Sequence, residues 1–542
     1  MKLKRTVIAP ALVAGVALVS GGWLLQQEVG GQQSVFQRAQ LFDEVLRYVQ
    51  TRYVDANSES DLYQKAVEGM LQELGDPHTV FMTADQYAQL HLQTSGEYGG
   101  LGIQIAPREG YITAVSVLPG TPAERAGIRV GDQLLEIDGK DARGWTDDFA
   151  VKLLRGPVGT PIRLKVRRVG VDQPMNFTLN REVIHVRSVP SAYMAAPGIG
   201  YVDLTVFSES SATELRAAID SLRTAGARKL VLDLRGNPGG LLDQGVAVSD
   251  LFLRRGQAIV ETRSRDPRES ETFRATSDEA YDLPMVVLVD PYSASAAEIV
   301  AGALQDHDRA LVVGNISYGK GSVQSVFPLS GGNVLKMTTG KWYTPVGRSI
   351  QKPFRPQDVD PEADPDSVAA DTVHADTARR RAYRTDAGRT VLGGGGIVPD
   401  VTVAPDTTTL AERALITAVS RKASVFNDVM LRYAVEYERR APNLARNFQI
   451  TPEMHRELFN RLRAAGVELT WEQFEAGRRL IDARLVTEIS ISRFGQAAAA
   501  QRNDVDDRTL QQAIRLLQGA DTQAALFQAA QRLQPAVAAR PR

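Results

Sequence analysis

The stretch MVVLVDPYSASAAEIVAGAL, residues 285–304, joins an apolar strand to a helix through a turn at residues 291–292. The apolar residues after Glu298 recur at helical spacing, so we expect one face of this helix to be buried in a core. Ser295 then lies near the helix N-terminus, where unpaired backbone N–H groups and the positive end of the dipole favour an anion. A strand that leads directly into a helix predicts an α/β layered core.

A second segment, YGKGSVQ at residues 318–324, places Lys320 between two glycines in a mostly uncharged surrounding. A serine nucleophile needs a base, and a lysine serves as one only when its amine is neutral. Burial achieves this, because desolvation disfavours the ammonium form and lowers a lysine pKa. Taken alone, Ser295 is a helix-capping residue and Lys320 a surface lysine. Together they predict a Ser-Lys pair, with Gln324 orienting the amine.

Two backbone segments could stabilise an oxyanion formed when Ser295 attacks a carbonyl. The Ala296 amide, at the start of the helix, is one candidate donor. The other is the sequence DLRGNPGG at residues 233–240, where an apolar strand ends in a glycine-rich turn containing Gly239 and Gly240. An ordinary strand-to-helix turn is the alternative interpretation of this segment.

At these residues the chain resembles the C-terminal processing, or tail-specific, protease family of Ser-Lys endopeptidases. The matching motifs are Gly-Asp-Pro-His at 75–78, Ser-Ala-Ser-Ala-x-Glu-Ile at 293–299, Ala-Leu-Gln-Asp at 303–306, Gly-Lys-Gly-Ser-Val-Gln at 319–324, Tyr-Thr-Pro-x-Gly-Arg-Ser-Ile-Gln at 343–351 and Gly-Gly-Gly-Gly-Ile-Val-Pro-Asp at 393–400. They follow in order over residues 38–405.

This resemblance implies that Ser295 is the nucleophile, Lys320 the base and Gln324 its partner, whereas Ser293 is structural. It also implies an oxyanion hole made by the Ala296 amide and one glycine of the pair at 239–240. No His-Glu-x-x-His metal site occurs in the sequence, and we expect neither a metal nor a cofactor.

A trypsin-like Ser-His-Asp enzyme is the competing interpretation, but the sequence argues against it. Position 238 is proline where a serine would be needed, and the chain has six histidines. His307 follows Ser295 by twelve residues, which is roughly 18 Å along a helix. It is therefore too far away to be the general base for Ser295. No Gly-x-Ser-x-Gly elbow is present either.

A second module, at residues 95–183, resembles a PDZ domain. EYGGLGI at 97–103 opens a β-rich stretch, and TPAERAG at 121–127 predicts a short helix that begins at proline and ends at glycine. A PDZ domain binds an extended peptide as an added strand and its terminal carboxylate in backbone amides. The matching peptide-binding loop is Gly99, Gly100, Leu101 and Gly102. A β-domain that only packs against the core is the alternative.

Composition sets the remaining limits. The chain has 542 residues, a net charge of −1 and 43% hydrophobic residues, which fits several globular domains and gives no sign of nucleic-acid binding. There is no cysteine, so disulfides and thiol catalysis are excluded. Basic residues at positions 2, 4 and 5 precede an uncharged run over residues 6–27. This pattern favours an uncleaved membrane anchor within residues 1–30, with a cleaved signal peptide as the alternative.

The rest of the chain gives a multidomain α/β organisation. We expect an N-terminal helical arm at 38–94, a protease core at 184–405 with a solvated acidic insertion at 355–380, and a helical extension at 406–542. In the resembled family the arm can mediate dimerisation, so a homodimer is one expected partner. Within the core, residues 201–207, 229–234, 285–289 and 311–313 are predicted strands, and 212–225 is a predicted helix.

These features together predict a serine endopeptidase on the periplasmic side of a bacterial cell envelope, anchored in the inner membrane. Its expected substrates are proteins or peptides recognised through free C-terminal tails. A catalytically idle PDZ scaffold that binds protein C-termini is the alternative function.

Overall fold

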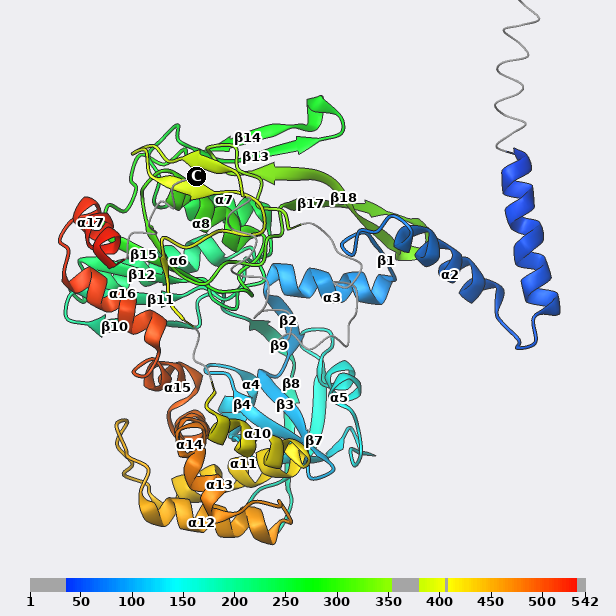
Figure 1. The fold of residues 1–542 in the computed structure, drawn as a ribbon. Coiled ribbons are helices and arrows are strands. Elements are labelled where there is room, and N and C mark those ends of the chain that lie inside the picture. Colours follow the sequence, from blue (N-terminus) through cyan, green and yellow to red (C-terminus); the bar gives the residue numbers. More distant parts are fainter. Residues whose placement is uncertain (1–35, 353–379, 405–407, 534–542) are drawn as a thin grey trace, which may run out of the picture. The chain divides into compact units, whose positions relative to one another are not determined.

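A computed structural model describes residues 36–352, 380–404 and 408–533 (Figure 1). The predicted membrane segment at 1–30 and all but the last residue of the acidic insertion lie outside the described residues. Within the described ranges, no helix is long and apolar enough to cross a bilayer. The described residues form two compact units, one of residues 36–83 with 326–337, the other of residues 84–325 with 338–352, 380–404 and 408–533.

The smaller unit contains the N-terminal arm. Its elements are a helix over residues 36–52, α2 Glu59–Gln72 and β1 Val80–Met82. Ser58 caps α2 by accepting a hydrogen bond from the Asp61 amide. β1 pairs antiparallel with the first residues of β18 (Val334–Tyr343), with Phe81 opposite Leu335. Large apolar side chains of the first helix, such as Leu41, are exposed.

The larger unit begins with α3 (Ala84–Ser95) and a β-rich module with its own hydrophobic core. Its elements are β2 Glu97–Gly100, β3 Ile103–Arg108, β4 Tyr111–Val117, α4 Pro122–Ala126, β5 Gln133–Ile137, β6 Lys140–Asp141, α5 Asp147–Leu154, β7 Pro161–Arg167, β8 Met175–Asn180 and β9 Glu182–His185. The sheet order is β3-β4-β5-β7-β8, and β2 pairs separately with β9. The predicted helix after Thr121 is α4, which Gly127 ends with a φ of 85°.

The protease core is built on a six-stranded sheet of order β10-β11-β12-β15-β16-β21. Its strands are β10 Ser191–Ala196, β11 Ile199–Asp203, β12 Lys229–Asp233, β15 Met285–Val289, β16 Leu311–Gly314 and β21 Val401–Thr402. All neighbours from β11 to β21 are parallel, whereas β10 is antiparallel to β11. Parallel strands buried on both faces need continuous apolar sequences, and MVVLV at β15 is entirely buried.

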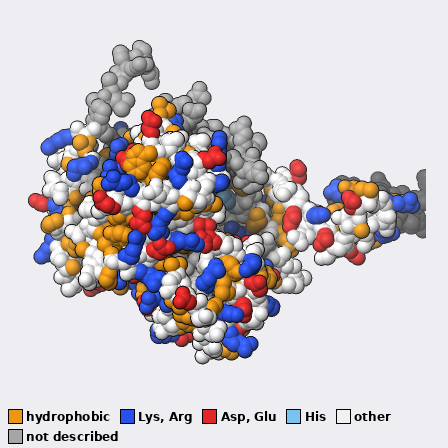
Figure 2. Space-filling model, turned by 90° about the horizontal axis from the view of Figure 1, so that it is seen from below, with side chains coloured by type: hydrophobic (Ala, Val, Ile, Leu, Met, Phe, Trp, Pro, Cys, Tyr) orange, Lys and Arg blue, Asp and Glu red, His pale blue; other side chains and the backbone are white. Residues whose placement is uncertain are grey.

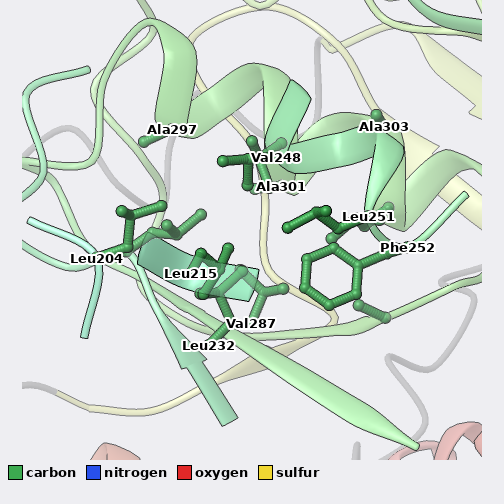
Figure 3. Packing of buried hydrophobic residues seen from close by; sticks show 14 of the residues in the cluster. Leu204, Leu215, Leu232, Val248, Leu251, Phe252, Val287, Ala297, Ala301 and Ala303 are labelled. Atoms are coloured by element: carbon green, nitrogen blue, oxygen red, sulfur yellow. The ribbon is translucent and has the colours of Figure 1, made fainter. Parts of the chain in front are cut away.

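Helices α6 (Ser211–Thr224), α7 (Leu242–Asp250) and α8 (Ala296–Asp306) cover one face of this sheet. Figure 3 shows the packing: Leu232 and Val287 of the strands face Leu215, Val248 and side chains of α8. The remaining elements of the core, up to residue 404, are β13 Ala258–Ser264, η1 Pro267–Glu269, β14 Glu271–Arg274, β17 Ser322–Pro328, η2 Ser330–Gly332, β19 Ala382–Arg384 and β20 Thr390–Leu392.

The other face of the sheet is covered by the two last helices of the chain, α16 (Arg508–Gln518) and α17 (Gln523–Leu533), as Figure 1 shows. Leu510, Ile514 and Leu517 lie on one side of α16 and pack against Val231 and Leu288 of the sheet. The C-terminal region therefore completes a three-layer core as well as forming a helical bundle of its own.

That bundle has a separate hydrophobic core. Its helices are α10 Leu410–Ser420, α11 Ala423–Arg440, α12 Pro452–Ala464, α13 Trp471–Ala476 and α14 Arg478–Phe494, and α15 (Gln496–Asn503) leads on to α16. α13 and α14 meet at Gly477. On the face seen in Figure 2, acidic and basic side chains are interspersed.

The predicted core strands are present, with one difference. The strand expected over residues 201–207 ends at Asp203, and Phe207 forms only an isolated parallel bridge with Gly240. The chain leaves the sheet because Phe207 turns toward the glycine-rich segment that follows β12. Its amide donates to the Gly239 carbonyl at 3.0 Å.

Candidate active site

The segments that carry the predicted site residues meet at one edge of the core sheet. β12 and β15 are parallel neighbours, so their carboxyl ends lie side by side. The turn at 236–240 follows β12, and Ser295 follows β15. Outside the carboxyl ends of adjacent strands is where open α/β sheets bind ligands. Backbone hydrogen bonds join the two segments, since the Ala294 amide donates to the Asn237 carbonyl at 2.9 Å.

Ser295 has an unusual backbone conformation, with φ 54° and ψ −116°. A positive φ is uncommon for a residue with a side chain and is often found where a site requires it. Hydrogen bonds at both ends of the residue stabilise this conformation: the Ser295 amide donates to Glu298 Oε2 at 2.9 Å, and the Ser295 carbonyl accepts from the Ile299 amide. Ser295 is half-buried at the start of α8.

Gly239 lies in close contact with this serine. A Cβ built on Gly239 would lie 2.7 Å from Ser295 Cβ and 3.0 Å from the Ala296 nitrogen, so only glycine fits there. Its φ of 94° adds a second reason for glycine. The Gly239 amide donates to Asn237 Oδ1 at 2.8 Å. In the part of the chain that the structure describes, the Ala296 amide has no hydrogen-bond acceptor.

Gly240 is required for a different contact. A Cβ on Gly240 would lie 2.1 Å from the Phe207 carbonyl oxygen. The two hydrogen bonds of this bridge run from the Phe207 amide to Gly239 and from the Leu241 amide to Phe207, which leaves the Gly240 amide outside the bridge. Both predicted glycines therefore lie at the turn, but Gly239 is the one in contact with Ser295.

Glu298 joins the segments of Ser295 and Lys320, and the sequence analysis gave it no role. Its carboxyl is completely buried and accepts four hydrogen bonds. Oε2 accepts from the amides of Ser295 and Lys320, both at 2.9 Å, and Oε1 accepts from the Gly319 amide at 2.7 Å and Ser317 Oγ at 2.5 Å. The backbones of Ser295 and Lys320 thus lie within two hydrogen-bond lengths of each other.

The charge state of Glu298 reflects two opposing effects. Burial raises the pKa of its carboxyl to about 7, although the hydrogen bonds from Ser317, Lys320, Gly319 and Ser295 oppose this by favouring the anion. All four neighbours are donors, so the ionised form satisfies them best. Its signal in the sequence was its position three residues after Ser295, which places it in the first turn of the helix.

The loop that carries Lys320 is fixed by hydrogen bonds that its carbonyl groups accept from two other segments. The Lys320 carbonyl accepts from Trp342 Nε1 at 3.1 Å, and the Gly319 carbonyl accepts from the Lys352 amide at 2.8 Å. A Cβ on Gly319 would lie 2.9 Å from the Gly396 nitrogen, so the glycine run at 393–396 packs closely against this loop. The Lys320 side chain is half-buried.

The remaining predicted residues lie as follows. Gln324 Nε2 donates to Ser322 Oγ at 2.9 Å and to Thr338 Oγ1 at 3.3 Å. Ser293 is buried, and its hydroxyl donates to the Leu234 carbonyl at 2.8 Å. His307 lies at the opposite end of α8 from Ser295, between Asp386 and the Ala258 carbonyl, so it cannot act on that serine.

The predicted peptide-binding loop borders a small cavity of about 60 Å³ in the β-rich module. Gly100, Leu101 and Gly102 line one side, and Val151 and Leu154 of α5 line the other. Gly99 lies beside it, where a Cβ would be 2.1 Å from the Gly156 carbonyl oxygen. The Arg155 guanidinium lies 4.5 Å from the centre of the Tyr98 ring at the rim.

Comparisons with known proteins match these parts in the same order. Residues 198–363 match the family model of peptidase family S41, residues 89–167 match the PDZ domain, and residues 23–86 match the N-terminal domain of the activating protease CtpB. The carboxy-terminal-processing protease of Bartonella bacilliformis is 41% identical over 346 residues, which are 62% of this chain and 79% of that protein.

Two further relatives carry the same description. The carboxy-terminal processing protease CtpA of Bacillus subtilis is 34% identical over 65% of this chain and 75% of its own length. The carboxyl-terminal-processing protease of Synechocystis is 40% identical over 53% of this chain and 68% of its own length. These relatives are proteases, so an idle scaffold is not favoured. The chain belongs to the carboxy-terminal processing protease family, serine peptidases of family S41, and it carries a PDZ domain.

Proposed function

We propose that this protein is an endopeptidase in which Ser295 is the nucleophile and Lys320 the general base. The observation that carries the proposal is the buried Glu298 carboxyl, which binds the amides of both residues through one oxygen. A base must lie within hydrogen-bond reach of the proton it takes, and this shared acceptor holds the two backbones close enough for a lysine side chain to reach the serine hydroxyl.

In the proposed reaction, the neutral Lys320 amine takes the proton of Ser295 Oγ while the oxygen attacks the substrate carbonyl. The Ala296 amide, with an amide of the turn at Gly239–Gly240, stabilises the oxyanion of the tetrahedral intermediate. The protonated lysine then gives its proton to the leaving amine, which departs and leaves an ester on Ser295. Water attacks this ester with Lys320 again as the base, so the second product is a carboxylic acid and the enzyme is restored.

Gln324 has an orienting role in this proposal. Its amide nitrogen is held by Ser322 and Thr338. These contacts fix the carboxamide on the strand that begins two residues after Lys320, without adding a charge that would stabilise the ammonium form.

We also propose that substrates are recognised through their free C-terminal tails. The cavity beside Gly99–Gly102 is apolar and small, which suits one apolar terminal side chain, and β3 is an edge strand to which a peptide can be added. A peptide bound there would place its carboxylate at the amides of the glycine-rich loop.

Location and assembly form the last part of the proposal. The basic N-terminus and the uncharged run after it support an anchor in the inner membrane, with the protease on the periplasmic side of a bacterial envelope. The exposed apolar side chains of helix 36–52 support the arm at 38–94 as a homodimer contact. The division into 95–183, 184–405 and 406–542 is supported by separate hydrophobic cores, although α16 and α17 complete the protease core.

The test is cleavage of unfolded protein by the full chain in detergent, with Ser295→Ala and Ser293→Ala compared. We expect Ser295→Ala to abolish cleavage. Ser293→Ala should retain measurable cleavage at reduced thermal stability, because it loses a buried hydrogen bond to Leu234. If Ser293→Ala lost activity and Ser295→Ala kept it, the assignment of Ser295 as the nucleophile would be wrong.

A further inference from the structure

Strand β12 is tied to the C-terminal region at both of its ends. At its start, Lys229 Nζ donates to the Leu517 carbonyl and pairs with Asp521 at 2.9 Å. Beyond its end, Arg235 Nη1 pairs with Asp507 at 2.6 Å. Only the second tie adjoins the glycine-rich turn, since Arg235 immediately precedes Gly236.

Arg235 is held on the strand side by a bidentate ion pair. Its Nε and Nη2 donate to the two carboxylate oxygens of Asp233, and its own amide also donates to Asp233 Oδ1 at 2.9 Å. The planar guanidinium fork fixes geometry as well as charge. With Asp507 on its third nitrogen, the side chain is 22% exposed and has little freedom.

Asp507 is held equally firmly on the side of the C-terminal region. Its Oδ1 accepts from the amides of Thr509 and Leu510, so it is the N-cap of α16. Its Oδ2 is the oxygen that meets Arg235. One carboxylate therefore joins the first turn of α16 to the residue that begins the turn at 236–240.

The surroundings make Arg235 the balancing charge of this region. Asp203, Asp233, Asp504 and Asp507 all lie near it, and its guanidinium is the cation in the ion pairs of Asp233 and Asp507. Tyr201 donates to Asp233 at 2.9 Å and Tyr193 donates to Asp504. Burial and the neighbouring carboxylates raise the pKa of Asp203 to about 7 and that of Asp504 to about 6. Removing Arg235 would leave carboxylates in mutual repulsion at the start of the turn.

The turn is fixed by contacts of its own: the Ala294 amide donates to the Asn237 carbonyl, and the Phe207 amide donates to the Gly239 carbonyl. Gly236 donates to Asp290 Oδ1 at 3.0 Å, and the buried Asn237 side chain donates to the Leu204 carbonyl and accepts from Gly239. Gly239 then contacts Ser295. Arg235 directly precedes this short segment, so its ion pair with Asp507 fixes the end at which the turn begins.

We infer that Arg235 is a positioning residue for the oxyanion turn and that Asp507, from the C-terminal region, fixes it for catalysis. The inference rests on the proposed function of Ser295 and the turn. It assigns the C-terminal region a part in the chemical step, through geometry and without contact with the substrate.

The test uses steady-state cleavage of fluorescently labelled β-casein by the full chain. Asp507→Asn removes the charge but keeps an N-cap acceptor, because asparagine caps helices as well as aspartate does. We expect kcat to fall about tenfold, as for a small misplacement of a catalytic group, with KM within about twofold. Arg235→Gln, which also loses the ion pair with Asp233, should lower kcat at least as much. The double variant should be no worse than Arg235→Gln alone, because the Arg235–Asp507 pair is already absent from that single variant.

Asp521→Asn is the matched control. It breaks the other ion pair between β12 and the C-terminal region, at the end of the strand remote from the turn, and should leave kcat and KM unchanged. An unchanged kcat in Asp507→Asn, or an equal loss in Asp521→Asn, would overturn the inference. Ser295→Ala, assayed in parallel, distinguishes failure of this inference from failure of the proposed function. If Ser295→Ala remains active, the proposed function is wrong as well. If it is inactive, a negative result counts only against the role of Arg235 and Asp507.

Discussion

The proposed catalytic edge, around Ser295, Gly239 and Lys320, and the proposed peptide groove, the cavity beside Gly99–Gly102, are built in opposite ways. At the edge, one buried carboxyl, Glu298, accepts four hydrogen bonds, and Gly239 lies against Ser295 with no space for a side chain. The groove beside Gly99–Gly102 is a small cavity lined mostly by apolar side chains, and the Arg155 guanidinium in its lining lies over the Tyr98 ring.

This difference indicates how the two regions divide the work. Buried polar networks are costly to leave partly unsatisfied, so they hold one geometry. A small groove lined mostly by apolar side chains can bind many tails weakly. Changes at the edge should therefore alter kcat strongly, and changes in the groove should alter selectivity modestly.

The largest effect is expected from Lys320→Arg. Arginine keeps its charge at any accessible pH and cannot take the proton of Ser295. We expect kcat for casein cleavage to fall by about a thousandfold or more, within the range of roughly a hundredfold to ten-thousandfold for loss of a general base. Lys320→His should restore little, because the imidazole cannot reach the same position. Retained turnover in Lys320→Arg would remove the lysine from the proposed pair.

The second largest effect is expected from Glu298→Gln. In glutamine an NH2 group replaces one carboxylate oxygen, so it would face a backbone N–H that now donates a hydrogen bond to Glu298. Two donors repel each other, so the segments of Ser295 and Lys320 should move apart. We expect kcat to fall about a hundredfold, as for a misplaced catalytic pair. The measurement is kcat with the melting temperature recorded alongside, and an unchanged kcat would show that the bridge is not needed.

The pH dependence gives a sharper form of the same prediction. The pKa of Glu298 is raised to about 7 from an ordinary value of 4.5, so the folded protein binds more protons than the unfolded chain between these values. The free energy of unfolding should therefore fall as pH rises through this window. Activity should rise over the same window, because the ionised form satisfies all four donors. Glu298→Gln should flatten both trends relative to the wild type, as followed by thermal unfolding and kcat between pH 5 and pH 8.

Much of this arrangement could be predicted from the sequence, for physical reasons that differ between parts. Ser295, the Lys320 loop and the turn at 236–240 are marked by local chemistry: a serine at a helix start, a lysine between glycines, and glycines after an apolar strand. The short helix predicted at 121–127 has an equally local signal.

The parts that could not be predicted depend on long-range contacts. The position of Glu298 three residues after Ser295 marks the first turn of the helix, but its hydrogen bonds to residues 317–320 depend on a distant segment folding onto it. The strand expected to reach Phe207 ends early because Phe207 forms its backbone bridge with Gly240, which lies more than thirty positions later in the chain. The pattern of α16 indicates an amphipathic helix, but nothing local says that it covers the core sheet.

A smaller loss at the edge is expected from Gln324→Ala. The variant removes the carboxamide held by Ser322 and Thr338, so the lysine loses an orienting neighbour but keeps its chemistry. We expect kcat to fall about tenfold, the value of one hydrogen bond of roughly 1.4 kcal/mol, with the fold retained. Thr339→Ala, which breaks the neighbouring Ser325–Thr339 hydrogen bond, is the control. Kinetics identical to the wild type would make Gln324 a structural residue only.

The smallest effect is expected at the groove, where the comparison predicts selectivity without loss of chemistry. Peptide substrates with a free, apolar C-terminus should be cleaved about fivefold faster in kcat/KM than the same peptides with an amidated end, since a partly exposed charge contact is worth about 1 kcal/mol. Val151→Glu places a negative charge in the groove and should abolish this preference while amidated peptides are cleaved as before. Lys152→Glu replaces a positive by a negative charge at the exposed neighbouring position of α5 and should preserve the preference. Equal rates for free and amidated peptides in the wild type would remove carboxylate recognition from the proposal. A Val151→Glu variant that loses activity on both would mean that the groove and the catalytic edge are not separable.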